Sequence, residues 1–216
     1  MDQFAVAAGE AGRALLLDCR TNEFTSVMIP DGLRIVVCHT GSDRALATSE
    51  YNTRQAECRR AVAAIRLVVP GVRSLRDVEE PMLDRLGGRL DEISMARVRH
   101  VVTENHRVAE AARALSDGDL EKLGRLFAGS HASLRDDYQV SSPELDLLVE
   151  IAIKIPGVVA ARMTGAGFGG CTVNLVTGDS VEELRAAVMA DYPSRSGRIP
   201  RVWEVAVVDG AGRLSA

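Results

Sequence analysis

The sequence predicts an α+β protein, because strand patterns near both ends of the chain enclose a long helical block. Short apolar runs rich in β-branched residues occur in the first forty residues. Amphipathic stretches follow between residues 50 and 155, with apolar residues near a 3.6-residue period. The remaining residues alternate as strand, glycine loop, strand, helix and strand. A helical block set apart from the strands favours α+β over a doubly wound sheet.

Each predicted element has its own local pattern, either a β-branched run or an apolar stripe. The expected strands are 14–17, 25–29, 33–38, 158–163, 171–176 and 202–208, and the expected helices are 50–66, 75–86, 94–115, 120–134, 143–155 and 180–190. Ser142 followed by Pro143 predicts an N-cap with proline in the first turn. Ser180 with Glu183 predicts a capping box.

Composition and charge exclude several classes of protein. The chain has 216 residues, 46% of them apolar, and 26 basic residues against 30 acidic ones give a net charge of −4. This mildly acidic chain has no basic stripe and no apolar run of ~18 residues, so neither nucleic acid nor a membrane is an expected partner. The four cysteines form no CxxC pair and the four histidines form no HExxH motif, which predicts a cytoplasmic protein without a structural metal.

Gly165-Ala-Gly-Phe-Gly-Gly170 is the most informative stretch. Four glycines in six residues indicate positive φ angles or a close backbone approach, and successive amides of such a loop can form an anion-binding nest. A tight β-hairpin explains the same composition equally well. The stretch also fits GxGxxG, but a strand pattern follows it where a dinucleotide-binding fold needs a helix. No Gly-Lys-Ser/Thr follows either, so a Walker A loop is excluded.

Two other positions are candidates on residue type alone. Tyr51, at the start of a predicted helix, has a ring and a hydroxyl suited to packing on a sugar, although an ordinary half-buried tyrosine fits as well. Asp2 is an acid at the second residue, where side chains are normally solvated. The charges of residues 134–138 are expected to solvate or cap a helix end.

Six segments that keep their order along nearly the whole chain carry a resemblance to a known family. They are Met1-Asp-Gln-Phe4, Ala14-Leu-Leu-Leu-Asp-Cys-Arg20, Ser49-Glu-Tyr-Asn-Thr-Arg-Gln-Ala-Glu-Cys58, Arg99-His-Val-Val102, Ser130 to Tyr138 and Met163 to Cys171. Together they resemble the galactokinase family of the GHMP small-molecule kinase superfamily. The last twenty residues match only loosely.

The resemblance implies both a fold and a reaction. The fold would be the GHMP-kinase C-terminal lobe, a ferredoxin-like sheet with helices, at residues 41–216, and residues 1–40 would be the remaining strands of the N-terminal lobe. The reaction would be ATP-dependent phosphorylation of galactose at its anomeric hydroxyl, which gives galactose 1-phosphate. ATP and Mg²⁺ are the implied cofactors.

The resemblance also assigns roles to the candidate residues. The family's catalytic aspartate falls on Asp2, which would accept or orient the proton of the attacking hydroxyl. Tyr51 corresponds to a tyrosine that contacts the sugar. The loop with Gly165, Gly167, Gly169 and Gly170 would lie beside the active site and help to organise the phosphoryl region. No metal ligand is assigned in this chain.

The chain begins where the second half of the family begins, and the family's N-terminal sugar motif and phosphate loop with its Mg²⁺ ligands have no counterpart here. We therefore expect the chain alone not to turn over, because neutralisation of the triphosphate is lost. The alternatives are a non-catalytic sugar-binding or regulatory module on the same scaffold, and a kinase for another sugar such as an N-acetylated hexosamine. Uncovered apolar surface predicts self-association or a partner N-terminal fragment.

Overall fold

The protein is built around one four-stranded antiparallel sheet, seen here in a computed structural model that describes residues 2–42 and 47–212. The strand order is β4–β5–β3–β6, and β1 and β2 form a separate two-stranded hairpin. The strands are β1 Arg13–Leu17, β2 Phe24–Met28, β3 Leu33–His39, β4 Val158–Thr164, β5 Cys171–Thr177 and β6 Arg201–Val205. These elements confirm the predicted α+β class.

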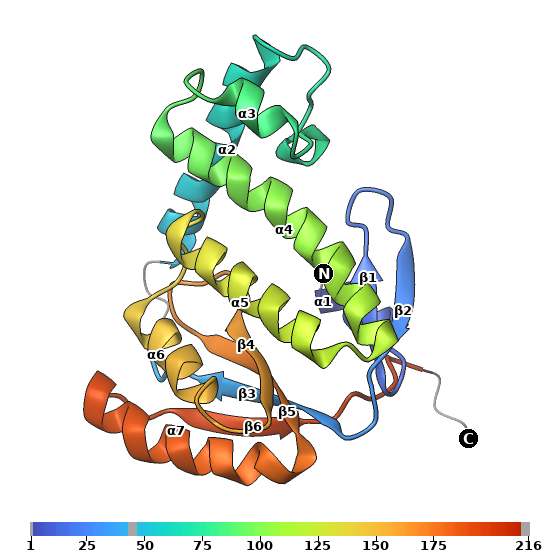
Figure 1. Cartoon of the computed structure of the whole chain (residues 1–216), viewed down its shortest axis with the longest axis vertical. Helices are drawn as coiled ribbons and strands as arrows, with labels where there is room; N and C mark the ends of the chain where they lie inside the picture. Colours follow the sequence, from blue (N-terminus) through green and yellow to red (C-terminus); the bar gives the residue numbers. More distant parts are fainter. Residues whose placement is uncertain (1, 43–46, 213–216) are drawn as a thin grey trace.

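Helices cover both faces of the sheet, with α5 on one side and α7 on the other (Figure 1). The helices are α1 Asp2–Ala8, α2 Ala47–Arg66, α3 Met82–Leu86, α4 Glu92–Asp117, α5 Leu120–Asp136, α6 Pro143–Ala152 and α7 Val181–Ser196, with 3₁₀ turns at Leu75–Asp77 and Gly178–Ser180. Ser142 caps α6 through the amide of Leu145, as predicted. None of the described helices is long and apolar enough to span a bilayer.

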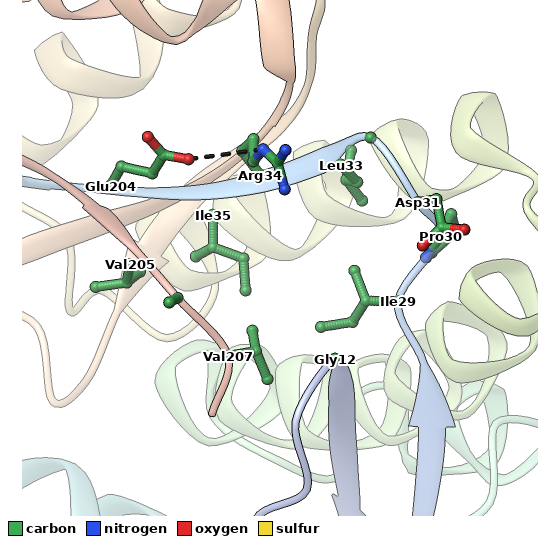
Figure 2. Close-up of a pocket in the computed structure, with 12 residues that line it drawn as sticks. Gly12, Ile29, Pro30, Asp31, Leu33, Arg34, Ile35, Glu204, Val205 and Val207 are labelled. Carbon is green, nitrogen blue, oxygen red and sulfur yellow. Dashed lines mark ion pairs between the residues drawn. The ribbon is translucent and has the colours of Figure 1, made fainter. Parts of the chain in front are cut away.

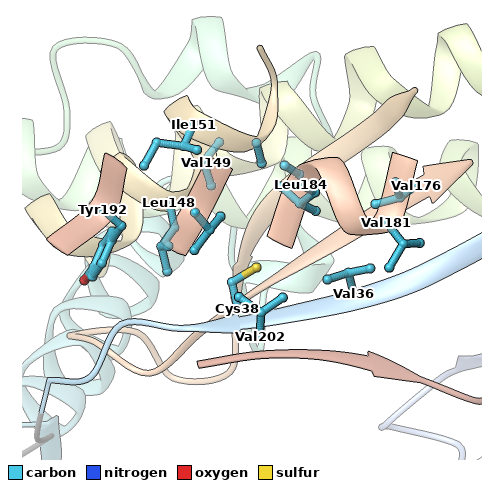
Figure 3. Packing of buried hydrophobic residues seen from close by; sticks show 13 residues of the cluster. Val36, Cys38, Leu148, Val149, Ile151, Val176, Val181, Leu184, Tyr192 and Val202 are labelled. Atoms are coloured by element: carbon cyan, nitrogen blue, oxygen red, sulfur yellow. The ribbon is translucent and has the colours of Figure 1, made fainter. Parts of the chain in front are cut away.

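The largest core lies between the sheet and the helices α6 and α7 (Figure 3). Val36 and Val176 from the sheet pack there with Leu148 of α6 and Leu184 of α7, and all four are at most 1% exposed. A smaller core on the other face joins Leu175 to α4 and α5. A third cluster holds α2 against α4 and the turn at 75–77, so the upper part of the molecule in Figure 1 has a core of its own.

The predicted helix over 75–86 is wrong, because the structure has a 3₁₀ turn, an irregular stretch and then α3. Pro81 lies just before α3, and a proline there removes an amide donor and disfavours helical geometry in the preceding residue. The predicted strand to residue 208 ends at Val205. Beyond it the chain leaves the sheet, and the carbonyl of Val207 accepts from the amide of Gly12.

Two predictions at helix starts are also wrong. The first forty residues were expected to be strands, but Asp2–Ala8 is helical, as suits an alanine-rich segment with an acid in its first turn. Ser180 makes no side-chain cap bond, because the 3₁₀ turn leads straight into α7 and ψ at Ser180 is 3° rather than extended. The division of the chain after residue 40 stays a prediction, and β3 on its N-terminal side is bonded to both β5 and β6.

Candidate functional site

The glycine loop, residues 165–170, joins the antiparallel strands β4 and β5 as a hairpin connection. Five of its residues have positive φ angles, at Gly165 (79°), Gly167 (85°), Phe168 (58°), Gly169 (115°) and Gly170 (88°). Such angles favour glycine, which explains the composition of the loop. Cys171 begins β5 directly after the loop, as the sequence indicated.

The loop also needs glycine because backbone and side chains from elsewhere lie against it. A Cβ on Gly167 would come within 2.1 Å of the carbonyl oxygen of Val140, and one on Gly169 would come within 2.6 Å of Ser42 Oγ. The same Val140 oxygen accepts a hydrogen bond of 2.8 Å from the amide of Phe168, and Thr40 N–H donates to Gly170 O at 2.8 Å. The loop is therefore held between the end of β3 and the segment around Val140.

That segment, residues 137–140, is called here the loop support, and two arginines bond to it. Arg97 of α4 donates to the carbonyl oxygen of Asp137 and, at 2.8 Å, to Oε1 of Gln139. Arg54 of α2 donates to the carbonyl oxygen of Gln139 at 3.2 Å. These bonds fix Gln139 in a left-handed conformation, φ 56°, that a non-glycine residue rarely adopts.

The two arginines share one carboxylate, Glu57 of α2. Arg97 Nε lies 2.7 Å and Arg54 Nη1 3.0 Å from Glu57 Oε2, and the Arg97 side chain is only 2% exposed. Burial by itself would raise the pKa of Glu57, but the bond and charge of Arg97 and the charge of Arg54 outweigh it, so the pKa is lowered. A buried arginine that is paired and bonded at all three nitrogens is rigid, and so is what it holds.

A second set of buried polar groups lies against the loop support one turn further along α4. The ring of His100 stacks on the ring of Tyr138, with centroids 4.4 Å apart. His100 Nδ1 also lies 3.0 Å from Ser133 Oγ, and that hydroxyl donates a hydrogen bond to Asp137 Oδ2. Burial lowers the pKa of His100 to about 4, so the ring is neutral at neutral pH. Burial also raises the pKa of Tyr138.

The glycine loop and the helix that carries Tyr51 contact the same support. Tyr51 is 55% exposed on α2, one turn before Arg54, and its nearness contributes to the raised pKa of Tyr138. Arg54 then reaches Gln139 in the segment that positions the glycine loop. Helix α2, which carries the predicted sugar residue, and the predicted phosphoryl loop are thus both bonded to residues 137–140.

Asp2 lies elsewhere, exposed in the first turn of α1. That helix contacts the hairpin through Phe4 and Phe24, whose ring centroids are 5.2 Å apart, and the carbonyl oxygen of Val6 accepts from the amide of Ala211. In Figure 1 α1 lies beside the hairpin, whereas the start of α2 lies toward the opposite end of α5. The role assigned to Asp2 stays a prediction.

Sequence reasoning missed Arg97 and Gln139. Arg97 stands one residue before Val98 and four before Val101, inside the apolar stripe of a predicted helix, and a charged residue there was the available signal. The prediction that the charges of residues 134–138 solvate or cap a helix end is confirmed only in part. Asp137 is the C-cap residue of α5, but its carbonyl oxygen also accepts a hydrogen bond from Arg97.

Two openings lie along α2 (about 490 Å³) and between the hairpin and the sheet. A cavity of about 440 Å³ separates the hairpin from the sheet, lined among others by Ile29, Ile35 and Val207 (Figure 2). At its rim Arg34 pairs with Glu204 at 3.6 Å. Within residues 2–42 and 47–212, no three His, Cys, Asp or Glu side chains are grouped so as to hold a metal ion. The described residues therefore contain no preformed cation site with three such ligands.

Comparison with known proteins defines the class first. The model of the GHMP kinases C terminal matches residues 109–194, the stretch that includes the loop support and the glycine loop. The structure of mevalonate kinase from L. major has a similar fold, with a TM-score of 0.60 and 20% identity over 93% of this chain and 50% of that one. The fold is that of a GHMP kinase.

The more similar relatives are galactokinases. Galactokinase from Roseiflexus sp. is 46% identical over 214 residues, which cover 99% of this chain and 55% of the relative. Galactokinase from Clostridium acetobutylicum is 40% identical over 100% of this chain and 56% of its own length. The structure of Lactococcus lactis galactokinase complexed with galactose has a TM-score of 0.92 and 39% identity, covering 98% of this chain and 55% of that one. The chain is similar to galactokinases over nearly its whole length, and it spans just over half the length of these relatives.

Proposed function

We propose that this chain supplies one wall of a galactokinase active site, which transfers a phosphoryl group from ATP to the anomeric hydroxyl of galactose. The observation that carries the proposal is the similarity, over 98% of the chain, to a galactokinase whose structure holds galactose. The hydrogen bond of Arg54, one turn after Tyr51, to Gln139 beside the glycine loop supports it, because a sugar site must adjoin a phosphoryl site for direct transfer.

Each candidate residue has a defined part in this reaction. Asp2 accepts or orients the proton of the anomeric hydroxyl, which makes that oxygen a better nucleophile. Tyr51, exposed on α2, packs its ring on the sugar and directs its hydroxyl to it. The glycine loop is fixed in advance by the bond from the Phe168 amide to Val140 O, so it can line the phosphoryl region without reorganisation.

Completing this site requires a second wall. Phosphoryl transfer depends on charge neutralisation by Mg²⁺ when the metal is bound, and the described residues hold no group of three His, Cys, Asp or Glu side chains for it. Apolar surface near the hairpin is also uncovered, including Phe24 and Met28 on β2, which are 45% and 61% exposed. Both features fit a chain that works with the other lobe of a galactokinase, linked or separate. Alone, the chain should not release ADP.

The experiment joins this chain to the part of Roseiflexus galactokinase that it does not cover. We expect the chimera to release ADP only when galactose and ATP are both present, and Asp2→Asn to lower kcat by about a hundredfold or more. Asp179→Asn, a change in an exposed turn after β5, is the matched control and should leave kcat unchanged.

Two results would contradict the proposal. Saturable galactose binding in calorimetry without ADP release would favour the sugar-binding or regulatory module instead. Faster turnover with an N-acetylated hexosamine than with galactose would keep the kinase chemistry and change the substrate.

A further inference from the structure

The loop support is a place where two strained residues meet. Gln139 and Phe168 both have left-handed φ angles, 56° and 58°, although neither is glycine. They are joined through Val140, whose carbonyl oxygen accepts from the amide of Phe168 at 2.8 Å. Backbone strain of this kind persists only where surrounding contacts over-determine it, and it clusters at functional sites.

Arg97 makes contacts that hold Gln139 in this conformation. The side chain comes from α4, is 2% exposed, and divides its guanidinium among three acceptors on two other parts of the chain. One acceptor is Glu57 of α2, and the other two are the carbonyl oxygen of Asp137 and the side chain of Gln139. A planar fork can hold these three directions at once, which a lysine ammonium on a flexible stem cannot do.

We propose that Arg97 is a positioning residue for the glycine loop, which it sets through residues 137–140 without touching substrate. The assignment rests on the proposed function for its catalytic meaning, but its structural part stands alone. Because Val140 O is the acceptor for Phe168 and the atom nearest to a Cβ on Gly167, a shift of the support moves the loop with it. The same residue also orders Glu57 and hence Arg54, one turn from Tyr51.

Amide hydrogen exchange on the chain itself tests the structural part. In Arg97→Met we expect peptides covering residues 164–171 to exchange about tenfold faster or more, while peptides from α7 keep their protection. Arg107→Met is the matched control, because Arg107 lies on the same helix and pairs with Glu104 at the same 2.7 Å, yet its hydrogen bonds stay within that helix. It should leave the glycine loop unchanged.

Two further variants test whether the effect comes from unfolding of the protein or from loss of the positive charge alone. Gln139→Gly removes one acceptor of Arg97 and suits the left-handed φ, so it should fold and loosen the loop less than Arg97→Met does. Arg97→Lys keeps the charge beside Glu57 but loses the fork, so it should recover protection only in part. Unchanged exchange at 164–171 in Arg97→Met, equal loosening in Arg107→Met, or full recovery in Arg97→Lys would overturn the proposal.

Kinetics in the chimera test the catalytic part. A positioning role predicts that Arg97→Met lowers kcat by a larger factor than it raises the KM for galactose, with partial rescue by Arg97→Lys. A loss confined to KM would overturn it. The exchange result does not depend on turnover, so an unmutated chimera that fails to phosphorylate galactose would count against the proposed function and not against the link from Arg97 to the loop.

Discussion

The two sides of the candidate site are held in very different ways. On the glycine-loop side, a nearly inaccessible Arg97 and its carboxylate partner bind the loop support, and two strained residues are kept in place. On the Asp2 side, α1 has no buried residue and rests on the hairpin through one edge-to-face pair of phenylalanines and a few backbone bonds. The hairpin tip is tied to the rest by exposed ion pairs such as Arg20 to Asp77.

This difference shows which part of the site the chain can organise alone. Buried charges that are hydrogen-bonded hold their surroundings in a single geometry. Exposed ion pairs contribute little to folding stability, so the backbone near them can open locally. The glycine-loop side is therefore preformed, whereas α1 with Asp2 is held by a few surface contacts. We infer that the second wall acts mainly on the Asp2 side.

The largest expected effect that sharpens this contrast is that of Gly167→Ala. The added Cβ would lie 2.1 Å from Val140 O, and the alanine would have to keep a φ angle near 85°. We therefore expect a loss of about 3 kcal/mol in the free energy of unfolding, measured with urea. Gly88→Ala has a similar φ of 73° and nothing within 4 Å, so it should cost only about 1 kcal/mol. Equal costs for the two variants would mean that the loop support is not rigid.

A smaller effect is expected from Arg20→Met at the hairpin tip. Arg20 is half-exposed and bonds Asp77 and Ser74 across to the turn before α3, so its loss should cost less than about 1 kcal/mol. Exchange of peptides from residues 13–28 should rise at low salt, and the difference should vanish in high salt because exposed charges are screened.

Arg13→Met is the control for that experiment, since among the described residues Arg13 forms an ion pair with nearby Glu10 at 3.3 Å. It should leave the hairpin tip unchanged. A cost of several kcal/mol for Arg20→Met would contradict the contrast between the two regions.

The sequence allowed the elements with strong periodicity and the glycine loop to be predicted, because their signals are local. The strand after Gly170 and the cap at Ser142 follow from neighbouring residues alone. The helix at residues 2–8 was missed because its sequence is short and surrounded by strand patterns. Arg97 was missed for another reason: its importance depends on Asp137 and Gln139, about forty residues away, which only tertiary structure brings to it.

The account depends most on one claim, that helix α2 and the glycine loop share residues 137–140 as a common support. A double-mutant cycle between Arg54→Met and Gly167→Ala tests it directly, because the first change acts on Gln139 O and the second on Val140 O. Unfolding free energies should show a coupling of about 0.5 kcal/mol or more, whereas the cycle of Arg54→Met with Gly88→Ala should be additive. Additivity of Arg54→Met with Gly167→Ala would contradict the claim.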